Sequence, residues 1–277
     1  MPRFSGKAVI VTGSSSGIGR ATALLFAQDG AQVTVTGRNS ERLEETRQVI
    51  LKAGVSAGNI NAVIADLTDP NGQDQIIRTT LDKFGKINIL VNNAGVNIMD
   101  GSIGTDQPIE LYHRILQVNL QSVIEMTKKA KEHLIKTKGE IVNVSSTAAG
   151  PQALPQTPYY SIAKAALDQY TRSTAIDLIQ YGIRVNSVSP GVVETGFLSA
   201  MGLPESVGQK LNTFLASKKE CIPVGHCGKP EDIANVVLFL ADRSLSSYII
   251  GQSIVADGGS TLISGMGAQD LLSIMSQ

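Results

Sequence analysis

A tyrosine and a lysine stand one helical turn apart in the segment Tyr160-Ser161-Ile162-Ala163-Lys164. Residues at positions i and i+4 share one face of a helix, so the phenol and the ammonium group should lie close enough to interact. A neighbouring cation stabilises the phenolate and is expected to bring the tyrosine pKa down towards a range useful for acid–base catalysis. Tyr160 is therefore the candidate proton donor and acceptor, and Tyr159 is not, because no lysine stands four residues after it.

Hydroxyl groups follow an apolar run that precedes this tyrosine. In Asn143-Val144-Ser145-Ser146, the run ends on serines that would hold a substrate oxygen beside the phenol. Ser146 is the favoured candidate and Thr147 the alternative.

A glycine-rich segment, Thr12-Gly13-Ser14-Ser15-Ser16-Gly17-Ile18-Gly19, joins the first apolar run to a helical pattern. Glycines allow the backbone to approach a pyrophosphate, and the free N–H groups at a helix start favour its negative charge. This context predicts a dinucleotide site, whereas the alternative is a tight turn that binds nothing. The candidate contacts are Gly13, Ser15, Ser16, Gly17, Ile18 and Gly19.

The end of the second apolar run bears on the choice of coenzyme. An NAD site places an acid here to hold the adenosine ribose, whereas a 2′-phosphate needs a cation. No Asp or Glu occurs between Gly30 and Glu41, and Arg38 stands at this point, with Ser14, Ser15 and Asn39 as further donors. The sequence therefore predicts NADP(H), with NAD less favoured; the alternative is that Arg38 is simply an exposed residue opening a helix.

Elements that alternate along the chain must position these residues. Short β-branched runs predict seven strands, and amphipathic patterns between them predict helices. We expect an α/β fold: a single doubly wound domain over residues 1–277, with a seven-stranded parallel sheet flanked by helices on both faces. Residues 194–228 break the alternation and are a candidate substrate loop, and 261–277 form a C-terminal tail. The predicted strands are 8–12, 32–36, 61–65, 87–92, 140–145, 184–189 and 253–256; the predicted helices are 18–29, 40–53, 70–84, 108–136, 158–180 and 230–241.

Composition argues against several other classes of protein. Lys and Arg number 24, as do Asp and Glu, so no basic surface for nucleic acid is expected. Two cysteines, Cys221 and Cys227, are too few for a secreted disulfide scaffold, and His226 beside Cys227 lacks further ligands for a metal. No run approaches 18 apolar residues and the N-terminus lacks an apolar signal region, so we expect no membrane span and a cytoplasmic location.

Taken together and in this order, the motifs resemble those of the short-chain dehydrogenase/reductase superfamily, of the single-domain Rossmann type. The resemblance covers about residues 5 to 260. It implies that Asn119, Ser146, Tyr160 and Lys164 are catalytic, that Asn119 distorts its helix to seat a proton-relay water, and that Lys164 holds the nicotinamide ribose. Ser146 to Tyr160 is one residue longer than the commonest family spacing, and Ser16 stands where many NADP-using relatives carry Arg or Lys. The remaining residues that the resemblance assigns to the coenzyme are Asp66, Leu67, Asn93, Ala94, Gly95, Pro190, Gly191, Val193 and Thr195.

The sequence thus predicts an NADP(H)-dependent carbonyl reductase that interconverts a carbonyl and a secondary alcohol, with Tyr160 as general acid and base. One alternative is a non-catalytic NADP-binding protein of the same fold, and another is an NAD-dependent alcohol or sugar dehydrogenase. Apolar residues within 196–227 favour a lipophilic carbonyl substrate as much as they favour simple core packing: Phe197, Leu198, Met201, Leu203, Leu211, Phe214 and Leu215. The helices at 108–136 and 158–180 are expected to pair in a homotetramer, or else a homodimer.

Overall fold

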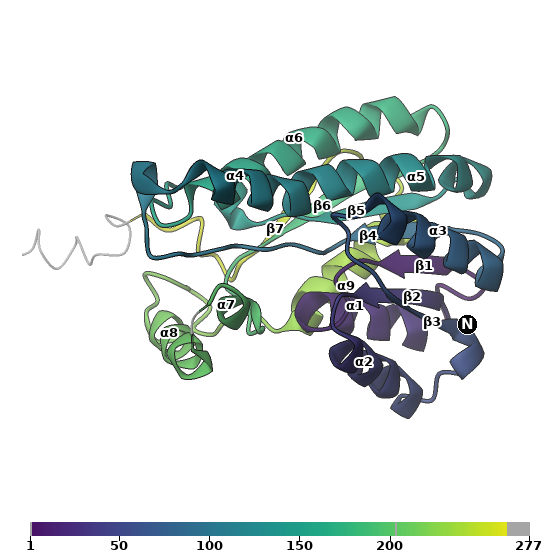
Figure 1. Ribbon diagram of the computed structural model, residues 1–277, viewed down its shortest axis with the longest axis horizontal. Helices are drawn as coiled ribbons and strands as arrows, with labels where there is room; N and C mark the ends of the chain where they lie inside the picture. Colours follow the sequence, from purple (N-terminus) through teal and green to yellow (C-terminus); the bar gives the residue numbers. More distant parts are fainter. Residues whose placement is uncertain (1, 203, 265–277) are drawn as a thin grey trace, which may run out of the picture.

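The computed structural model describes residues 2–202 and 204–264 and contains a seven-stranded, wholly parallel sheet (Figure 1). The spatial order β3-β2-β1-β4-β5-β6-β7 places β1 and β4 side by side at the point where the chain reverses its direction of winding. The predicted doubly wound sheet is confirmed. Its strands are β1 (Ala8–Val11), β2 (Gln32–Gly37), β3 (Ile60–Ile64), β4 (Ile89–Asn92), β5 (Glu140–Val144), β6 (Arg184–Pro190) and β7 (Ser253–Ala256).

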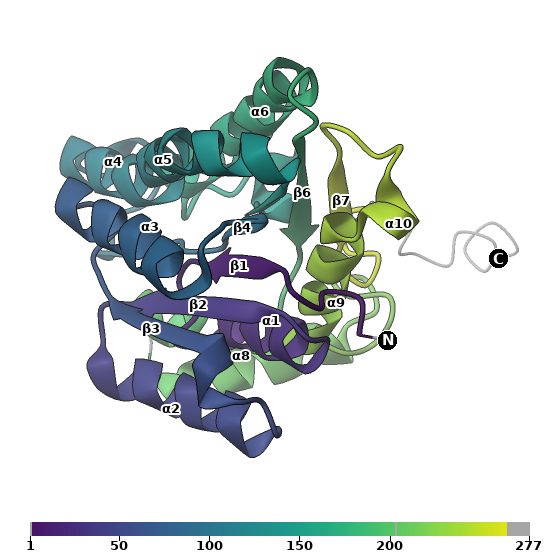
Figure 2. The same cartoon turned by 90° about the vertical axis from the view of Figure 1, so that its right-hand side faces the viewer.

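Helices cover both faces of the sheet, as Figure 2 shows. Side chains alternate along a strand, so Val9 and Val11 pack towards one layer while Ile10 packs towards the other. The first layer is α1 (Gly17–Gln28), α2 (Ser40–Lys52) and α9 (Pro230–Ala241); the second is α3 (Pro70–Phe84), α4 (Ile109–Leu116), α5 (Ser122–Thr137) and α6 (Pro158–Ile179).

The helix expected over 108–136 is interrupted. A π-helical turn at Gln117–Gln121 separates α4 from α5 and carries Asn119. Such turns insert one extra residue into the helix and are common at functional sites. The helical period of the sequence continues through this turn, so the sequence predicted a single helix, and that prediction was wrong. The distortion at Asn119 that the family resemblance implied is present.

The segment predicted as a substrate loop, 194–228, leaves the sheet and returns to the same place. Val193 and Gly228 form a parallel bridge, and Glu194 N donates to Gly228 O over 2.8 Å. Between these ends lie α7 (Phe197–Ala200) and α8 (Glu205–Ser217). The segment is therefore a helical insertion closed at its base, and Figure 1 shows it standing apart from the sheet layers.

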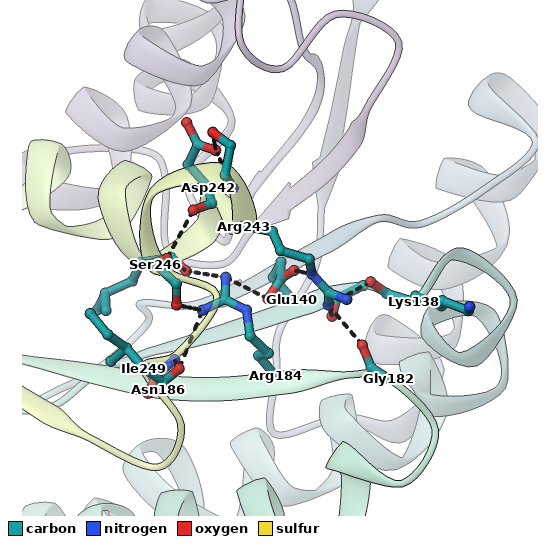
Figure 3. A network of polar contacts seen from close by, with 12 residues as sticks. Lys138, Glu140, Gly182, Arg184, Asn186, Asp242, Arg243, Ser246 and Ile249 are labelled. Carbon is teal, nitrogen blue, oxygen red and sulfur yellow. Dashed lines mark hydrogen bonds and ion pairs between the residues drawn. The ribbon is translucent and has the colours of Figure 1, made fainter.

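A buried ionic cluster at the N-terminal ends of β5 and β6 joins segments that are distant in the sequence (Figure 3). Glu140 opens β5, and its carboxylate lies 2.9 Å from Arg184 Nη2 and 2.7 Å from Arg243 Nε. Arg184 also donates to the Leu240 and Ser246 carbonyls, at 2.8 and 2.6 Å. Arg243 belongs to α10 (Arg243–Ser246). The cluster therefore links two central strands to the α9–α10 connection, far along the strands from their carboxyl ends.

Within the described residues no helix is both long and apolar enough to cross a membrane. The same part of the chain holds no group of three or more His, Cys, Asp or Glu side chains arranged to bind a metal ion. The predicted C-terminal tail lies outside the described residues from position 265 onward.

Candidate active site

The glycine-rich loop adopts the shape that a pyrophosphate would require. Gly13 and Gly17 have positive φ angles of 63° and 53°, a backbone region that favours glycine. A Cβ atom on Gly19 would lie only 2.4 Å from both Asn93 Nδ2 and Gly13 O. Asn93 in turn donates to Thr12 O and Gly13 O, at 2.8 and 3.1 Å. Asn93, which follows β4, thus holds the loop in place, and a side chain at these glycine positions would be strained or would clash.

A cavity of about 630 Å³ opens at the carboxyl ends of the strands, next to the β1–β4 junction. Open α/β sheets bind ligands at this place. Apart from Ser14 and Asn39, the residues predicted to contact the coenzyme line it, so the site fits a nicotinamide dinucleotide: Gly13, Ser15, Ser16, Gly17, Ile18, Gly19, Arg38, Asp66, Leu67, Asn93, Ala94, Gly95, Tyr160, Lys164, Pro190, Gly191, Val193 and Thr195.

Two arginines stand at the β2 end of this cavity. The Arg38 side chain is 64% exposed, and its Nη1 lies 3.8 Å from Asp66 Oδ2, too long for a tight ion pair. Arg42, one turn further into α2, lines the same cavity. Sequence reasoning missed Arg42, although its i+4 spacing from Arg38 was a usable signal. Arg38 is thus placed where a ligand phosphate can compete for it.

Near the β2 end of the cavity, three polar side chains hydrogen-bond within the chain: Asp66, Ser14 and Asn39. Burial alone would raise the pKa of Asp66, but hydrogen bonds from Thr68 N and Oγ1, with the Arg38 charge, bring it below its ordinary value. The Ser14 hydroxyl is buried and donates to Val11 O, and Asn39 Oδ1 accepts from Arg42 N at the start of α2. The Ser14 hydroxyl is therefore already engaged within the chain, whereas the bond at Asn39 uses only its amide oxygen, so phosphate binding by Asn39 stays a prediction.

Tyr160 lies in the cavity beside Ser146. Burial raises the pKa of Tyr160 to about 12, and a hydrogen bond with Ser146 opposes the rise. The sequence led us to expect a lowered pKa. The reason for the difference is that Lys164 Nζ lies 5.7 Å from the centre of the phenol ring, so desolvation outweighs the cation. The phenol is consequently held in its protonated form, the form that can donate a proton.

Ser146 follows β5 and caps the short helical turn Thr147–Ala149. Its Oγ accepts a hydrogen bond from Ala148 N at 3.1 Å. Thr147, the alternative by spacing, also lines the cavity, but the hydrogen bond to Tyr160 belongs to Ser146. Geometry therefore favours Ser146 as the hydroxyl partner of the phenol.

Lys164 is almost fully buried, at 3% exposure, and Nζ donates to Val144 O over 2.8 Å. Burial lowers the pKa of Lys164 to about 8, and the negative charge of Asp168 opposes this. Asp168 lies one helical turn after Lys164 on the same face of α6, and its carboxylate accepts a hydrogen bond from Ser187 Oγ over 3.4 Å. Sequence reasoning did not single out Asp168, because an acid four residues after a lysine is common on exposed helices.

Asn119 does not line the cavity. Its side chain is buried in the π-helical turn and clamps Val96, accepting from Val96 N and donating to Val96 O, both at 2.7 Å. A Cβ atom on Gly95 would stand 3.2 Å from Asn119 Oδ1 and 3.4 Å from Lys164 Nζ. The turn thus fixes the backbone that follows β4 against the lysine.

The insertion supplies an apolar wall opposite these polar groups. The Phe197 ring lies 5.9 Å from that of Tyr160, centre to centre. One expected wall residue does not fit this description, because Phe214 is 56% exposed and is not part of the lining. Leu203 lies outside the described residues. From the insertion the wall contains Phe197, Leu198, Met201, Leu211 and Leu215, and Leu154 joins it from the segment before α6.

Comparison with known proteins gives concordant matches over almost the whole chain. Residues 13–261 match the family model described as enoyl-(acyl carrier protein) reductase. A short-chain dehydrogenase/reductase from Caenorhabditis elegans, solved with cofactor, is 68% identical with a TM-score of 0.96, covering 97% of this chain and 100% of that one. Glucose dehydrogenase from the same organism, in the apo form, is 60% identical with a TM-score of 0.83, covering 94% and 100%. A 3-oxoacyl-[acyl-carrier-protein] reductase of Thermotoga maritima is 35% identical over 258 residues, 93% of this chain and 98% of the relative.

Proposed function

Because this chain belongs to the short-chain dehydrogenase/reductase superfamily, a family of oxidoreductases, we propose that it interconverts a carbonyl compound and a secondary alcohol with NADP(H). One observation carries the proposal. Tyr160, Ser146 and Lys164 line the same cavity as the glycine-rich loop, so a proton donor and a dinucleotide site open into one space. A protein that only bound the dinucleotide would have no use for a phenol paired with a serine hydroxyl in that space.

The proposed mechanism assigns one task to each side chain. Bound NADPH supplies a hydride. Ser146 and Tyr160 donate hydrogen bonds to the carbonyl oxygen, and both bonds strengthen as negative charge develops there. A C–H bond forms at the carbon while the Tyr160 proton passes to the oxygen, which gives the alcohol and a phenolate. Lys164 stabilises that phenolate and holds the nicotinamide ribose; the reverse sequence oxidises an alcohol.

Support for NADP(H) comes from the charge at the β2 end of the cavity. Arg38 and Arg42 are cations there, and the acid present, Asp66, follows β3 and lies 3.8 Å from Arg38. A 2′-phosphate would gain charge-assisted hydrogen bonds from the guanidinium groups, whereas the two hydroxyls of NAD would leave these cations unpaired. We therefore propose NADP(H) as the preferred coenzyme.

An NAD-dependent alcohol or sugar dehydrogenase is the second candidate. The specific observation in its favour is the 60% identity to a Caenorhabditis elegans glucose dehydrogenase. The two candidates share the mechanism and differ in coenzyme and in the polarity of the substrate. They are separated by the same measurements.

The test is a screen of ketones, aldehydes, alcohols and sugars with each coenzyme, followed by nicotinamide absorbance. Tyr160→Phe retains the ring and should lower turnover at least about 100-fold while coenzyme binding is unchanged. Tyr159→Phe is the matched control, because the Tyr159 hydroxyl donates to Gln107 O at 2.9 Å, outside the cavity lining. Its loss should cost stability rather than turnover. Full activity of Tyr160→Phe on the substrate found would refute the mechanism.

We further propose that the chain acts as a single domain and assembles through α6 and the α4–α5 pair. On α6, Ile176 and Ile179 are 73% and 40% exposed, unusual for residues of their size on a helix that faces only water. A homotetramer is the proposed assembly and a homodimer the alternative. Sedimentation at micromolar concentration distinguishes both from a monomer.

A further inference from the structure

Asn97 is a buried residue that lines the cavity, and the oxygen of its amide has no hydrogen-bond partner in the part of the chain that the structure describes. It is 5% exposed, and its Oδ1 is buried without a hydrogen-bond partner among residues 2–202 and 204–264. A buried amide without a partner costs about 1–3 kcal/mol. The cost is recovered only when something bound there completes its hydrogen bonds.

The backbone places Asn97 at the catalytic end of the cavity. The preceding residue, Val96, is clamped on both its N–H and its carbonyl by Asn119. One residue earlier, Gly95 abuts Lys164 Nζ. Consecutive Cα atoms are about 3.8 Å apart, so Asn97 stands within about 8 Å of that contact. It follows that a ligand held by Tyr160 is within reach of Asn97.

The wall that the insertion adds to this cavity is mainly apolar, and amide side chains are the exception in it. The insertion contributes leucines, Phe197 and Met201 to the wall, none of which can donate a hydrogen bond through its side chain. Asn212 on α8 is a second amide in the lining, and its Oδ1 is also buried without a partner in the described chain. Both oxygens need a donor. A plain ketone or a diketone offers acceptors alone, whereas a hydroxyl offers a donor and an acceptor.

Resting on the proposed function, we infer that Asn97 is a specificity-determining residue that binds a hydroxyl group of the substrate. The preferred substrates are then hydroxyketones, or in the oxidative direction the corresponding diols and polyols, whose carbon skeleton lies against the apolar wall. A site built to pair with a hydroxyl discriminates strongly against the analogue that lacks it, because its own polar groups are left unpaired.

The experiment compares matched phenyl ketones with and without a terminal hydroxyl. The pairs are 2-hydroxyacetophenone with acetophenone, 3-hydroxypropiophenone with propiophenone, and 4-hydroxybutyrophenone with butyrophenone, so that the hydroxyl lies one, two or three carbons from the carbonyl. We expect the wild-type enzyme to favour the hydroxylated member of at least one pair by about 10-fold or more in kcat/KM.

Asn97→Leu, which keeps the shape and removes the amide, should bring that ratio to about 1 and leave the Kd of NADPH unchanged. Leu215→Ala is the control, since it removes apolar contact and should lower kcat/KM for both members of the pair alike. A wild-type enzyme with no preference in any pair overturns the inference, as does an Asn97→Leu variant that keeps the preference; in both cases the proposed function stands. If the wild-type enzyme reduces no carbonyl compound at all, the proposed function fails and the inference with it.

Discussion

Asp168 should set the pH above which the enzyme loses activity. Lys164 must be charged to stabilise the phenolate, yet burial lowers its pKa to about 8, against the opposing charge of Asp168. Activity should therefore be full below this pH and fall as Lys164 loses its proton above it. Asp168→Asn removes the opposing charge, lowers the pKa of Lys164 further, and moves this fall to lower pH.

The size of the shift follows from the helix geometry. Four residues span about 6 Å of helix, so the two charges lie about 7 Å apart and interact by about 2.4 kcal/mol at an effective dielectric constant of about 20. Asp168 is partly exposed to solvent, and we halve this figure to about 1.2 kcal/mol, equivalent to about one pH unit. Asparagine can still accept the hydrogen bond from Ser187, so the fold should be retained.

The assay is the pH profile of kcat at saturating NADPH between pH 6 and 10. We expect wild type and Asp168→Asn to agree at the acidic end, with the basic limb of the variant displaced by about one unit. Asp177→Asn is the control. Asp177 is exposed on the same helix and lies about 20 Å from Lys164 along the helix axis, beyond the screening length of about 8–10 Å. Superimposable profiles for wild type and Asp168→Asn would refute the reasoning, and so would an equal loss of activity at every pH.

Three other changes have defined outcomes. Lys164→Met should abolish turnover yet raise the free energy of unfolding at pH 7 by about 1–3 kcal/mol, measured by denaturant titration, because the buried cation disfavours the fold. Since the native pKa lies below the unfolded one, this gain should disappear as the pH rises from about 8 towards 10.5. Arg38→Asp should weaken NADPH binding by about 10- to 100-fold and favour NADH, with Arg42→Ala weaker in the same direction; fluorescence titration showing equal wild-type affinity for both coenzymes contradicts it. Burial raises the pKa of Glu140 to about 7, but its carboxylate lies 2.9 Å from Arg184 and 2.7 Å from Arg243, so at pH 8 Glu140→Gln should lower stability by about 3–5 kcal/mol by leaving Arg184 without its counter-charge, with unchanged turnover per folded molecule; unaltered thermal unfolding would show that the cluster contributes nothing.

Much of the fold was accessible from the sequence because its signals are local. Each of the seven predicted strands exists, most with ends displaced by one or two residues; β4, for example, begins at Ile89 rather than 87. The glycine-rich loop was equally readable, since the positive φ angles of Gly13 and Gly17 favour glycine whatever surrounds them. Tyr160 and Lys164 were found by their helical spacing together with their place in the order of the family's motifs.

What the tertiary structure decided concerns burial and contacts between distant segments. The pKa of Tyr160 rises rather than falls because burial of the phenol, with the Phe197 ring of α7 5.9 Å away, outweighs the lysine cation, and no i+4 spacing reveals that burial. Asn119 turned out to hold Val96, across 23 residues, through a π-helical turn that the apolar period does not show. Whether an amide such as Asn97 has a partner depends on every neighbour folded around it. Local backbone conformation can therefore be predicted from the order of residues. The burial of a side chain, the shift of its pKa and the absence of a hydrogen-bond partner depend on the folded chain around it.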